Sequence, residues 1–144
     1  AEGIGTTKGV DANLDALSTE GNLRWHTDLA RKVSTQTGAA IVISGPIDIV
    51  ADSHEAWAIR NGHPMMANIT GTGCMSAGVI DPQALLPSCV CAMSAMGICG
   101  ELAYEKLLSV DGGSGTYRAL LMDAMSKLDG ATLTRRSKAE RLRI

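Results

Sequence analysis

The chain has 144 residues, 45% hydrophobic and 19% charged, which is enough for one compact domain with its own core and too little for two. Its formal net charge of −2 lacks the basic excess of a nucleic-acid-binding surface, and 3% aromatic residues provide no platform for stacking bases. No run of about 18 apolar residues predicts a membrane span and the first residues have no signal-peptide pattern, so we expect a cytoplasmic protein that binds neither nucleic acid nor membrane.

The first predicted elements form an α/β unit. Apolar spacing over 15–36 favours a helix that ends at Gly38. The continuous apolar run 39–43 is typical of a strand buried on both faces of a parallel sheet. Segments 47–51 and 56–60 flank a polar turn and predict an antiparallel hairpin. The sequence therefore predicts α/β architecture with a parallel central sheet and a small antiparallel edge.

The second half of the chain is predicted to be helical. A short helix following Cys74 is expected to end near Gly78. Asp81-Pro82 combines an N-cap with a proline suited to a first helical turn, and predicts a long helix reaching Leu108. A glycine-rich turn then precedes an amphipathic helix over 116–128.

The basic tail over 132–144 is interpreted as the solvated end of a helix, with a phosphate or other anionic partner as the alternative. The apolar surroundings of Cys89, Cys91 and Cys99 favour buried thiols over disulfides. Neither these thiols nor the scattered histidines have the spacing of a zinc site, and we predict no metal-ligating side chain.

The most informative motif is Gly71-Thr72-Gly73-Cys74, called the glycine turn below. Two glycines separated by one residue let the backbone turn sharply, with its N–H groups directed to one side. A helix that opens immediately afterwards adds a positive dipole end, so the turn is suited to hold an anion. Cys74 lies in the first helical turn, where a thiolate is stabilised, and is a candidate base or nucleophile.

The string from Asn61 to Met75, NGHPMMANITGTGCM, closely resembles the signature of the hydroxyethylthiazole kinases, a family of thiamine salvage with a ribokinase-like fold. Further segments agree with that family in order and spacing: Lys8-Gly9-Val10-Asp11, Ser44-Gly45-Pro46-Ile47-Asp48, Gly97-Ile98-Cys99-Gly100-Glu101-Leu102-Ala103, and 113–118 with 128–130. The resemblance extends from Lys8 to Leu142.

The resemblance implies phosphorylation of the hydroxyl of 4-methyl-5-(2-hydroxyethyl)thiazole by ATP with Mg²⁺. It implies that Cys74 accepts the hydroxyl proton, that Gly71 contacts the substrate, and that Thr72 and Gly73 help to form the anion hole for the phosphoryl group. Ser44 occupies the position of a family threonine that contacts ATP phosphate, and a turn-stabilising hydroxyl is the alternative for this residue.

Other polar candidates have simpler interpretations. Asp11 and Asp48 lie in predicted turns, where aspartate side chains often bond to their own backbone. His63 is interpreted as a structural turn residue, and Glu101 is either a buried functional acid or a solvent-facing residue. The following methionines are interpreted as core filling: Met65, Met66, Met75, Met93 and Met96.

Members of the family are longer than this chain, so residues 1–144 are expected to form the C-terminal portion of a single ribokinase-like kinase domain. The resemblance further implies a homotrimer with substrate pockets between subunits. We also expect exposed hydrophobic surface where an N-terminal half would cover the sheet. The alternatives are a catalytically inert fragment, which lacks the family's Asn-x-x-Glu magnesium motif, and a ribokinase-like kinase acting on another small alcohol.

Overall fold

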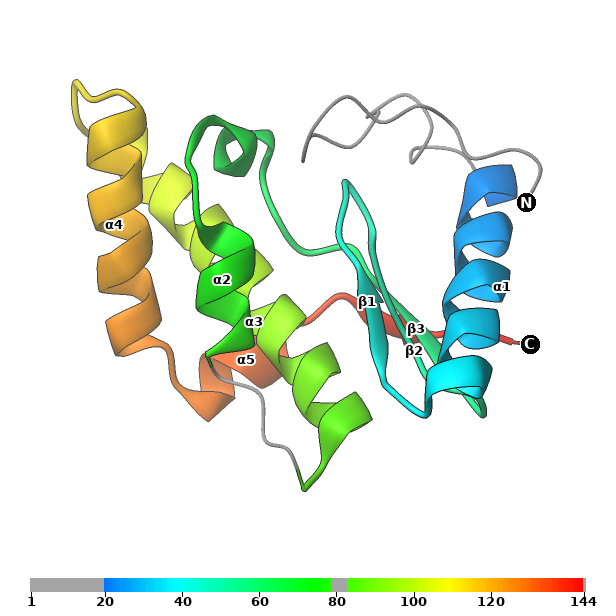
Figure 1. Cartoon of the computed structure of the whole chain (residues 1–144). Helices are drawn as coiled ribbons and strands as arrows, with labels where there is room; N and C mark the ends of the chain where they lie inside the picture. The colour runs from blue at the N-terminus through cyan, green and yellow to red at the C-terminus, as the bar shows by residue number, and fades with distance from the viewer. Residues whose placement is uncertain (1–19, 79–82, 144) are drawn as a thin grey trace.

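The computed structural model describes residues 20–78 and 83–143 (Figure 1). Its elements follow one another in this order: α1 (Glu20–Thr37), β1 (Ile41–Ile43), β2 (Asp48–Ala51), β3 (Ala56–Ile59), the 3-10 helix η2 (Pro64–Asn68), α2 (Thr72–Ala77), α3 (Leu85–Leu107), α4 (Ser114–Lys127), α5 (Gly130–Arg136) and β4 (Ala139–Arg141). The predicted α/β class is confirmed.

The four strands form one sheet in the order β1-β2-β3-β4, and each neighbouring pair is antiparallel. The predicted hairpin is confirmed, since Ile49 pairs with Ala58 and Val50 with Trp57. Its turn closes on Asp52, whose carboxylate accepts hydrogen bonds from the backbone N–H groups of two of the next three residues. An aspartate at this position favours the turn because it replaces backbone partners that the chain reversal removes.

The predicted parallel pairing of the strand at 39–43 is wrong for the described residues. β1 pairs antiparallel with β2, and the described sheet gives it no second neighbour. Its central residue, Val42, is 37% exposed, so the strand is not buried on both faces. A continuous apolar run indicates burial without fixing strand direction, because the partner strand decides whether the ladder is parallel or antiparallel.

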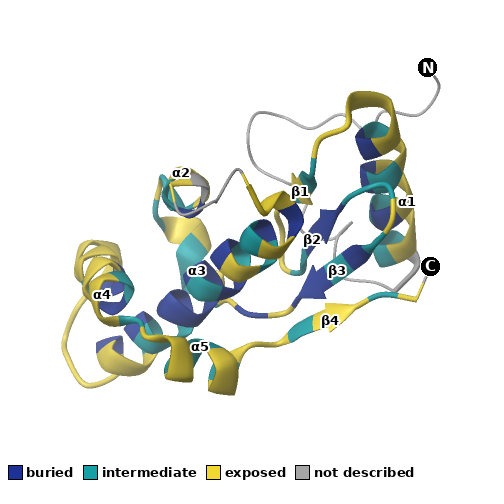
Figure 2. Cartoon of the chain, turned by 90° about the horizontal axis from the view of Figure 1, so that it is seen from below, coloured by how far each residue is buried: buried dark blue, intermediate teal, exposed yellow. Residues whose placement is uncertain are grey.

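The sheet lies between α1 on one side and α3 on the other (Figure 1). Alternate residues of β2 serve the two faces, as the two-residue period of a strand requires: Ile49 and Ala51 pack towards α1, and Val50 packs with residues of α3. A third cluster joins α3 to α4 around the fully buried Tyr117 and Leu121. Figure 2 shows that buried residues are concentrated in β2, β3 and α3.

Several helix boundaries match their sequence signals. α1 ends before Gly38, whose φ of 73° is the left-handed conformation that glycine tolerates, and whose N–H bonds to the Ser34 carbonyl at 2.7 Å. α2 ends at its predicted place, with Gly78 as C-cap. The expected cap Asp81-Pro82 and the expected start of the first helix at 15–19 lie outside the described residues. α3 begins at Leu85.

α3 corrects the expectation that no segment has the length and composition of a membrane span. In the part of the chain that the structure describes, it is the one helix that is long and apolar enough, and 56% of its most apolar window is buried inside the structure. Leu86 and Cys89 pack against the sheet, whereas Met96 and Ala103 pack with α4. The apolar composition of α3 follows from having neighbours on two sides.

The basic tail is a solvated helix end only in part. It contains the short helix α5, whose last turn carries Arg135 and Arg136, and then β4, which adds to the edge of β3. Three of its cationic side chains pair with acidic residues elsewhere in the fold: Arg136 with Glu105, Lys138 with Glu101, and Arg141 with Glu55. Charge spacing along one segment could not predict these pairs, because each partner lies far away in the sequence.

All four cysteines are free. Cys89 and Cys99 are buried as predicted, and burial raises the pKa of Cys99 to about 11. The prediction for Cys91 is wrong, since that thiol is exposed on α3.

Candidate functional site

The glycine turn forms the entry to α2. Gly71 is the N-cap with a φ of 98°, a left-handed conformation that strains other residues, and its carbonyl accepts the N–H of Met75 at 3.0 Å. Gly71 supplies no side-chain cap to the helix. Cys74 is the third residue of α2 and its thiol is exposed, so the predicted position in the first turn is confirmed.

Gly73 differs from Gly71 in what the fold demands of it. Its φ is not positive, and a Cβ at this position would meet no other atom within 4 Å. Neither backbone conformation nor packing within the described chain therefore requires glycine there. Among the described residues, the space beside Gly73 is therefore open, and the exposed Cys74 lies next to it.

The predicted site residues fall into two groups. Gly71, Thr72, Gly73 and Cys74 are contiguous and share one turn among the helices. Ser44 is exposed on the β1–β2 loop, on the sheet side of the molecule (Figure 1). Within residues 20–78 and 83–143, no described hydrogen bond or ion pair connects that loop to the glycine turn.

Asp48 stabilises the loop that carries Ser44. Its Oδ1 accepts the N–H of Gly45 at 2.9 Å, which matches the interpretation of Asp48 as a turn residue. Burial raises the pKa of Asp48 to about 6, and the Gly45 hydrogen bond only partly opposes that increase. The other turn aspartate considered above, Asp11, lies outside the described residues.

His63 has the predicted structural role at the start of η2. Its Nδ1 accepts the N–H of Met65 at 3.1 Å as the N-cap of that helix. Its ring stacks on Tyr104 of α3, with ring centroids 3.6 Å apart and planes 18° apart. These contacts hold the start of the segment that leads from β3 to the glycine turn.

Glu101 is neither of the two predicted extremes. Its side chain is only 15% exposed, and one of its two carboxylate oxygens, Oε1, accepts hydrogen bonds from Asn61, Gly62 and Lys138. No local pattern reveals these partners, because they lie 37 to 40 residues away in the sequence.

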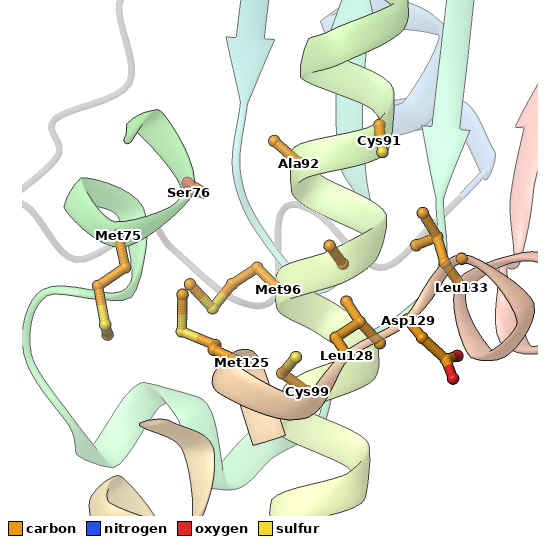
Figure 3. Close-up of a pocket in the computed structure, with 12 residues that line it drawn as sticks. Met75, Ser76, Cys91, Ala92, Met96, Cys99, Met125, Leu128, Asp129 and Leu133 are labelled. Atoms are coloured by element: carbon orange, nitrogen blue, oxygen red, sulfur yellow. The ribbon is translucent and has the colours of Figure 1, made fainter. Parts of the chain in front are cut away.

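An apolar pocket of about 250 Å³ lies between α2, α3 and the α4–α5 junction (Figure 3). Met75, the residue that follows Cys74, points into it beside Met96 and Met125. At its rim, Asp129 caps α5 by accepting the N–H of Thr132 at 2.7 Å. The methionines predicted as core filling do pack against the hydrophobic clusters, and Met75 and Met96 also line this pocket.

The described residues contain no group of three histidine, cysteine or acidic side chains placed to hold a metal ion. Their carboxylates are used in turns, caps and ion pairs, as for Asp52, Asp129 and Glu105. These residues therefore do not form a magnesium site by themselves.

The fold and sequence match known proteins. The structure of a hydroxyethylthiazole kinase protein from Pyrococcus horikoshii superposes with a TM-score of 0.71 and 21% identity, covering 86% of this chain and 49% of that one. Hydroxyethylthiazole kinase of Desulfovibrio desulfuricans is 47% identical over 150 aligned positions, which cover 95% of this chain and 53% of the relative. That of Clostridium acetobutylicum is 44% identical, covering 92% and 50%.

These matches place the chain among α/β proteins with the ribokinase-like fold. The model of the hydroxyethylthiazole kinase family matches residues 2–131, and the chain belongs to that family. It spans about half the length of the curated relatives that it matches.

Proposed function

We propose that this chain takes part in ATP-dependent phosphorylation of the hydroxyl of 4-methyl-5-(2-hydroxyethyl)thiazole. The observation that carries the proposal is the glycine turn: an exposed thiol in the first turn of α2, beside a glycine that neither packing nor backbone conformation requires. A ligand that must approach the main chain closely explains a glycine at such a position. The names of the relatives supply the reaction.

Each residue of the turn has a role in this proposal. Gly71 gives the left-handed entry and contacts the substrate, while the backbone amides of Thr72 and Gly73 face the charge of the transferring phosphoryl group. The substrate hydroxyl oxygen bonds to the γ-phosphorus as the bond to ADP breaks. The Sγ of Cys74 accepts the hydroxyl proton. Ser44 is proposed to contact ATP phosphate from the β1–β2 loop.

Magnesium, which the resemblance to the family implies, would neutralise charge on the nucleotide phosphates, and the described residues hold no group of side chains placed to bind it. Cytoplasmic location and assembly as a homotrimer are also proposed. α1 exposes Trp25 and Leu29 one turn apart, with 56% and 38% of each residue accessible, which is apolar surface that a neighbouring subunit would bury.

The test compares two glycines at the second residue of a helix. Gly73→Ala places a methyl group over the turn, and Gly115→Ala makes the same change in α4, where a Cβ also meets no atom within 4 Å. We expect both variants to unfold at the parent temperature or slightly above it, because alanine favours helix. Formation of thiazole phosphate from labelled ATP should fall about 100-fold in Gly73→Ala only.

A second pair tests the base. Cys74→Ala should lower product formation by about 100-fold or more, whereas Cys91→Ala, which removes the other exposed thiol, should leave the rate unchanged. Equal rates in Cys74→Ala and the parent would contradict the role of the thiol.

The competing function is a catalytically inert fragment. The observation behind it is that the chain covers 53% and 50% of the length of the two relatives named above. A parent chain that forms no thiazole phosphate and binds no MgATP in calorimetry would establish this alternative and overturn the proposal for this chain.

A further inference from the structure

We propose that Glu101 is a positioning residue: it fixes residues 61–70, the approach segment, and thereby the glycine turn to which this segment leads. The relevance of Glu101 to phosphoryl transfer rests on the function proposed above. The positioning itself depends only on the contacts within this chain and is testable separately.

One carboxylate oxygen of Glu101 connects two distant parts of the chain to α3. Oε1 accepts hydrogen bonds from the backbone N–H of Gly62 at 3.1 Å, from Nδ2 of Asn61 at 3.2 Å and from Nζ of Lys138 at 2.9 Å. The side chain is 15% exposed, so these bonds are only partly screened by water. Hydrogen bonds to a charged group are among the stronger ones in proteins.

Asn61 makes the arrangement mutually dependent. It is 5% exposed, and its Nδ2 also donates to the carbonyl of Arg136 at 2.9 Å. Its Oδ1 accepts the N–H of Lys138 at 2.7 Å. A buried amide is costly unless both of its ends are bonded. The side-chain amide of Asn61, at the start of the approach segment, therefore makes all of these hydrogen bonds only when Glu101 and the α5–β4 connection are both in place.

Two glycines of α3 let the approach segment come close enough to make these polar contacts. Gly97, one turn before Glu101, allows Asn61 to approach so closely that a Cβ would lie 2.6 Å from the Asn61 Cβ. Gly100 leaves room for the Met66 side chain in the same way. The positions 97, 100, 101 and 104 share one face of a helix, and residue 104 is the tyrosine on which His63 stacks. This face holds the approach segment over several residues.

η2, the central part of the approach segment, contains no fully buried residue, and its Met65 and Met66 are partly buried against the cluster between α3 and α4. Polar anchoring at Glu101 therefore adds to an apolar contact that is incomplete. At the far end, Met75 packs against the cluster that contains Met96. The glycine turn lies between these two anchors, and the Glu101 anchor is the one built from hydrogen bonds.

Glu105 provides a matched control. It lies one turn further along α3 and pairs with Arg136 through two bonds of 2.7 and 3.1 Å, with its side chain 56% exposed. Glu105→Ala therefore removes an ion pair with good geometry without removing a bond to the approach segment. A merely structural ion pair predicts that loss of either glutamate loosens the fold without preference for the approach segment, whereas the positioning role predicts an effect of Glu101 confined to that segment.

The experiment measures amide hydrogen exchange in the 144-residue chain and three variants. In Glu101→Ala, exchange over residues 61–70 should become about tenfold faster, and over β2–β3 it should stay within about twofold of the parent. Glu105→Ala should change neither region. Glu101→Gln should give an intermediate value, because its amide oxygen still accepts from Gly62 while the charge that attracts Lys138 is lost. Equal acceleration in Glu101→Ala and Glu105→Ala, or equal acceleration across the approach segment and β2–β3, would overturn the inference.

A chemical readout accompanies exchange. Iodoacetamide labelling of Cys74, divided by that of the exposed Cys91 in the same molecule, should depart from the parent ratio in Glu101→Ala and by less in Glu101→Gln, because the glycine turn moves with the approach segment. If Glu101→Ala does not fold, Glu101→Gln decides: it must accelerate exchange in the approach segment beyond that in β2–β3, or the inference is wrong. Unchanged exchange refutes the positioning role whatever the turnover, and absent turnover with accelerated exchange refutes only the proposed function.

Discussion

The sheet side and the helical side of this molecule are held together over different sequence distances. On the sheet side, β1 pairs with β2 and β2 pairs with β3, each across a short loop. On the helical side, the approach segment depends on partners 36 to 77 residues away, as when Asn61 contacts Gly97 and Lys138. The hairpin strands are therefore specified largely by residues close to one another in the sequence, whereas the position of the glycine turn depends on contacts between residues far apart in the sequence.

The largest expected effect is at the junction between the two sides. Gly97→Ala should lower the free energy of unfolding by about 3 kcal/mol, because the new methyl group meets the backbone of Asn61, which cannot move aside. Gly100→Ala is the matched variant, since its methyl group meets the flexible side chain of Met66. It should cost about 1 kcal/mol or less. Equal urea-unfolding midpoints for the two variants would contradict the close packing of Asn61.

On the sheet side, the next largest effect depends on pH. Folding raises the pKa of Asp48 from the ordinary value of 3.8 to about 6, so the folded protein favours the neutral carboxyl. Its contribution to the free energy of unfolding is therefore fully present below pH 3.8 and is lost as pH rises through about 6. Asp48→Asn keeps an oxygen for the Gly45 N–H and cannot ionise. It should stabilise the protein by about 2 kcal/mol at about pH 7.5 and have little effect at about pH 4.

Asp52 is the control with the opposite sign. Burial acts to raise its pKa, but hydrogen bonds from the N–H groups of Glu55 and His54 lower the pKa below its usual value. Its contribution to stability is therefore present at neutral pH and lost on acidification. Asp52→Asn should destabilise the protein near neutrality and less so in acid. Urea titrations of both variants at the two pH values would show whether the signs differ.

A smaller effect is expected inside the helical side. Tyr117 is fully buried, and its hydroxyl donates to the Gly100 carbonyl at 3.0 Å. Tyr117→Phe keeps the ring packing and removes that bond, so it should lower stability by about 1 kcal/mol. Burial raises the pKa of Tyr117 to about 12, and its ultraviolet titration should confirm that the parent hydroxyl resists ionisation. A Tyr117→Phe variant with the parent unfolding midpoint would refute the bond's contribution.

The smallest effect concerns the pair Glu55–Arg141, which joins the β2–β3 turn to β4 at the sheet edge with an N–O distance of 2.6 Å. The Arg141 side chain is 64% exposed, so water and salt screen the attraction. A double-mutant cycle with alanine at both positions should give a coupling of about 0.5 kcal/mol that decreases in high salt. A coupling above about 2 kcal/mol would show that β4 is held more rigidly than its exposure indicates.

Local signals predicted much of the scaffold. Gly38 ends α1, Asp52 closes the hairpin, and Gly78 ends α2, because each of these residues acts on the backbone within a few positions of itself. The position of Cys74 in the first turn of α2 was predictable for the same reason, since the two glycines before it allow the helix to begin there.

The errors concern partners that a local pattern cannot specify. The direction of β1 depends on which strand lies beside it, and β4 is a strand only because β3 offers it an edge. α3 has the composition of a membrane span because it is packed on two sides. The role of Glu101 depends on Gly62 and Lys138, which approach it only after the chain has folded back on itself.

The hydrogen bonds between Asn61 and the α5–β4 connection have a consequence for folding during translation. The partners of Asn61 there, the Arg136 carbonyl and the Lys138 amide, lie 75 and 77 residues further along the chain. During translation, the hairpin and α3 are therefore complete while the Asn61 side-chain amide still lacks those two bonds. A premature stop between α3 and Arg136 would leave β1, β2 and β3 present and both of these Asn61 bonds unmade.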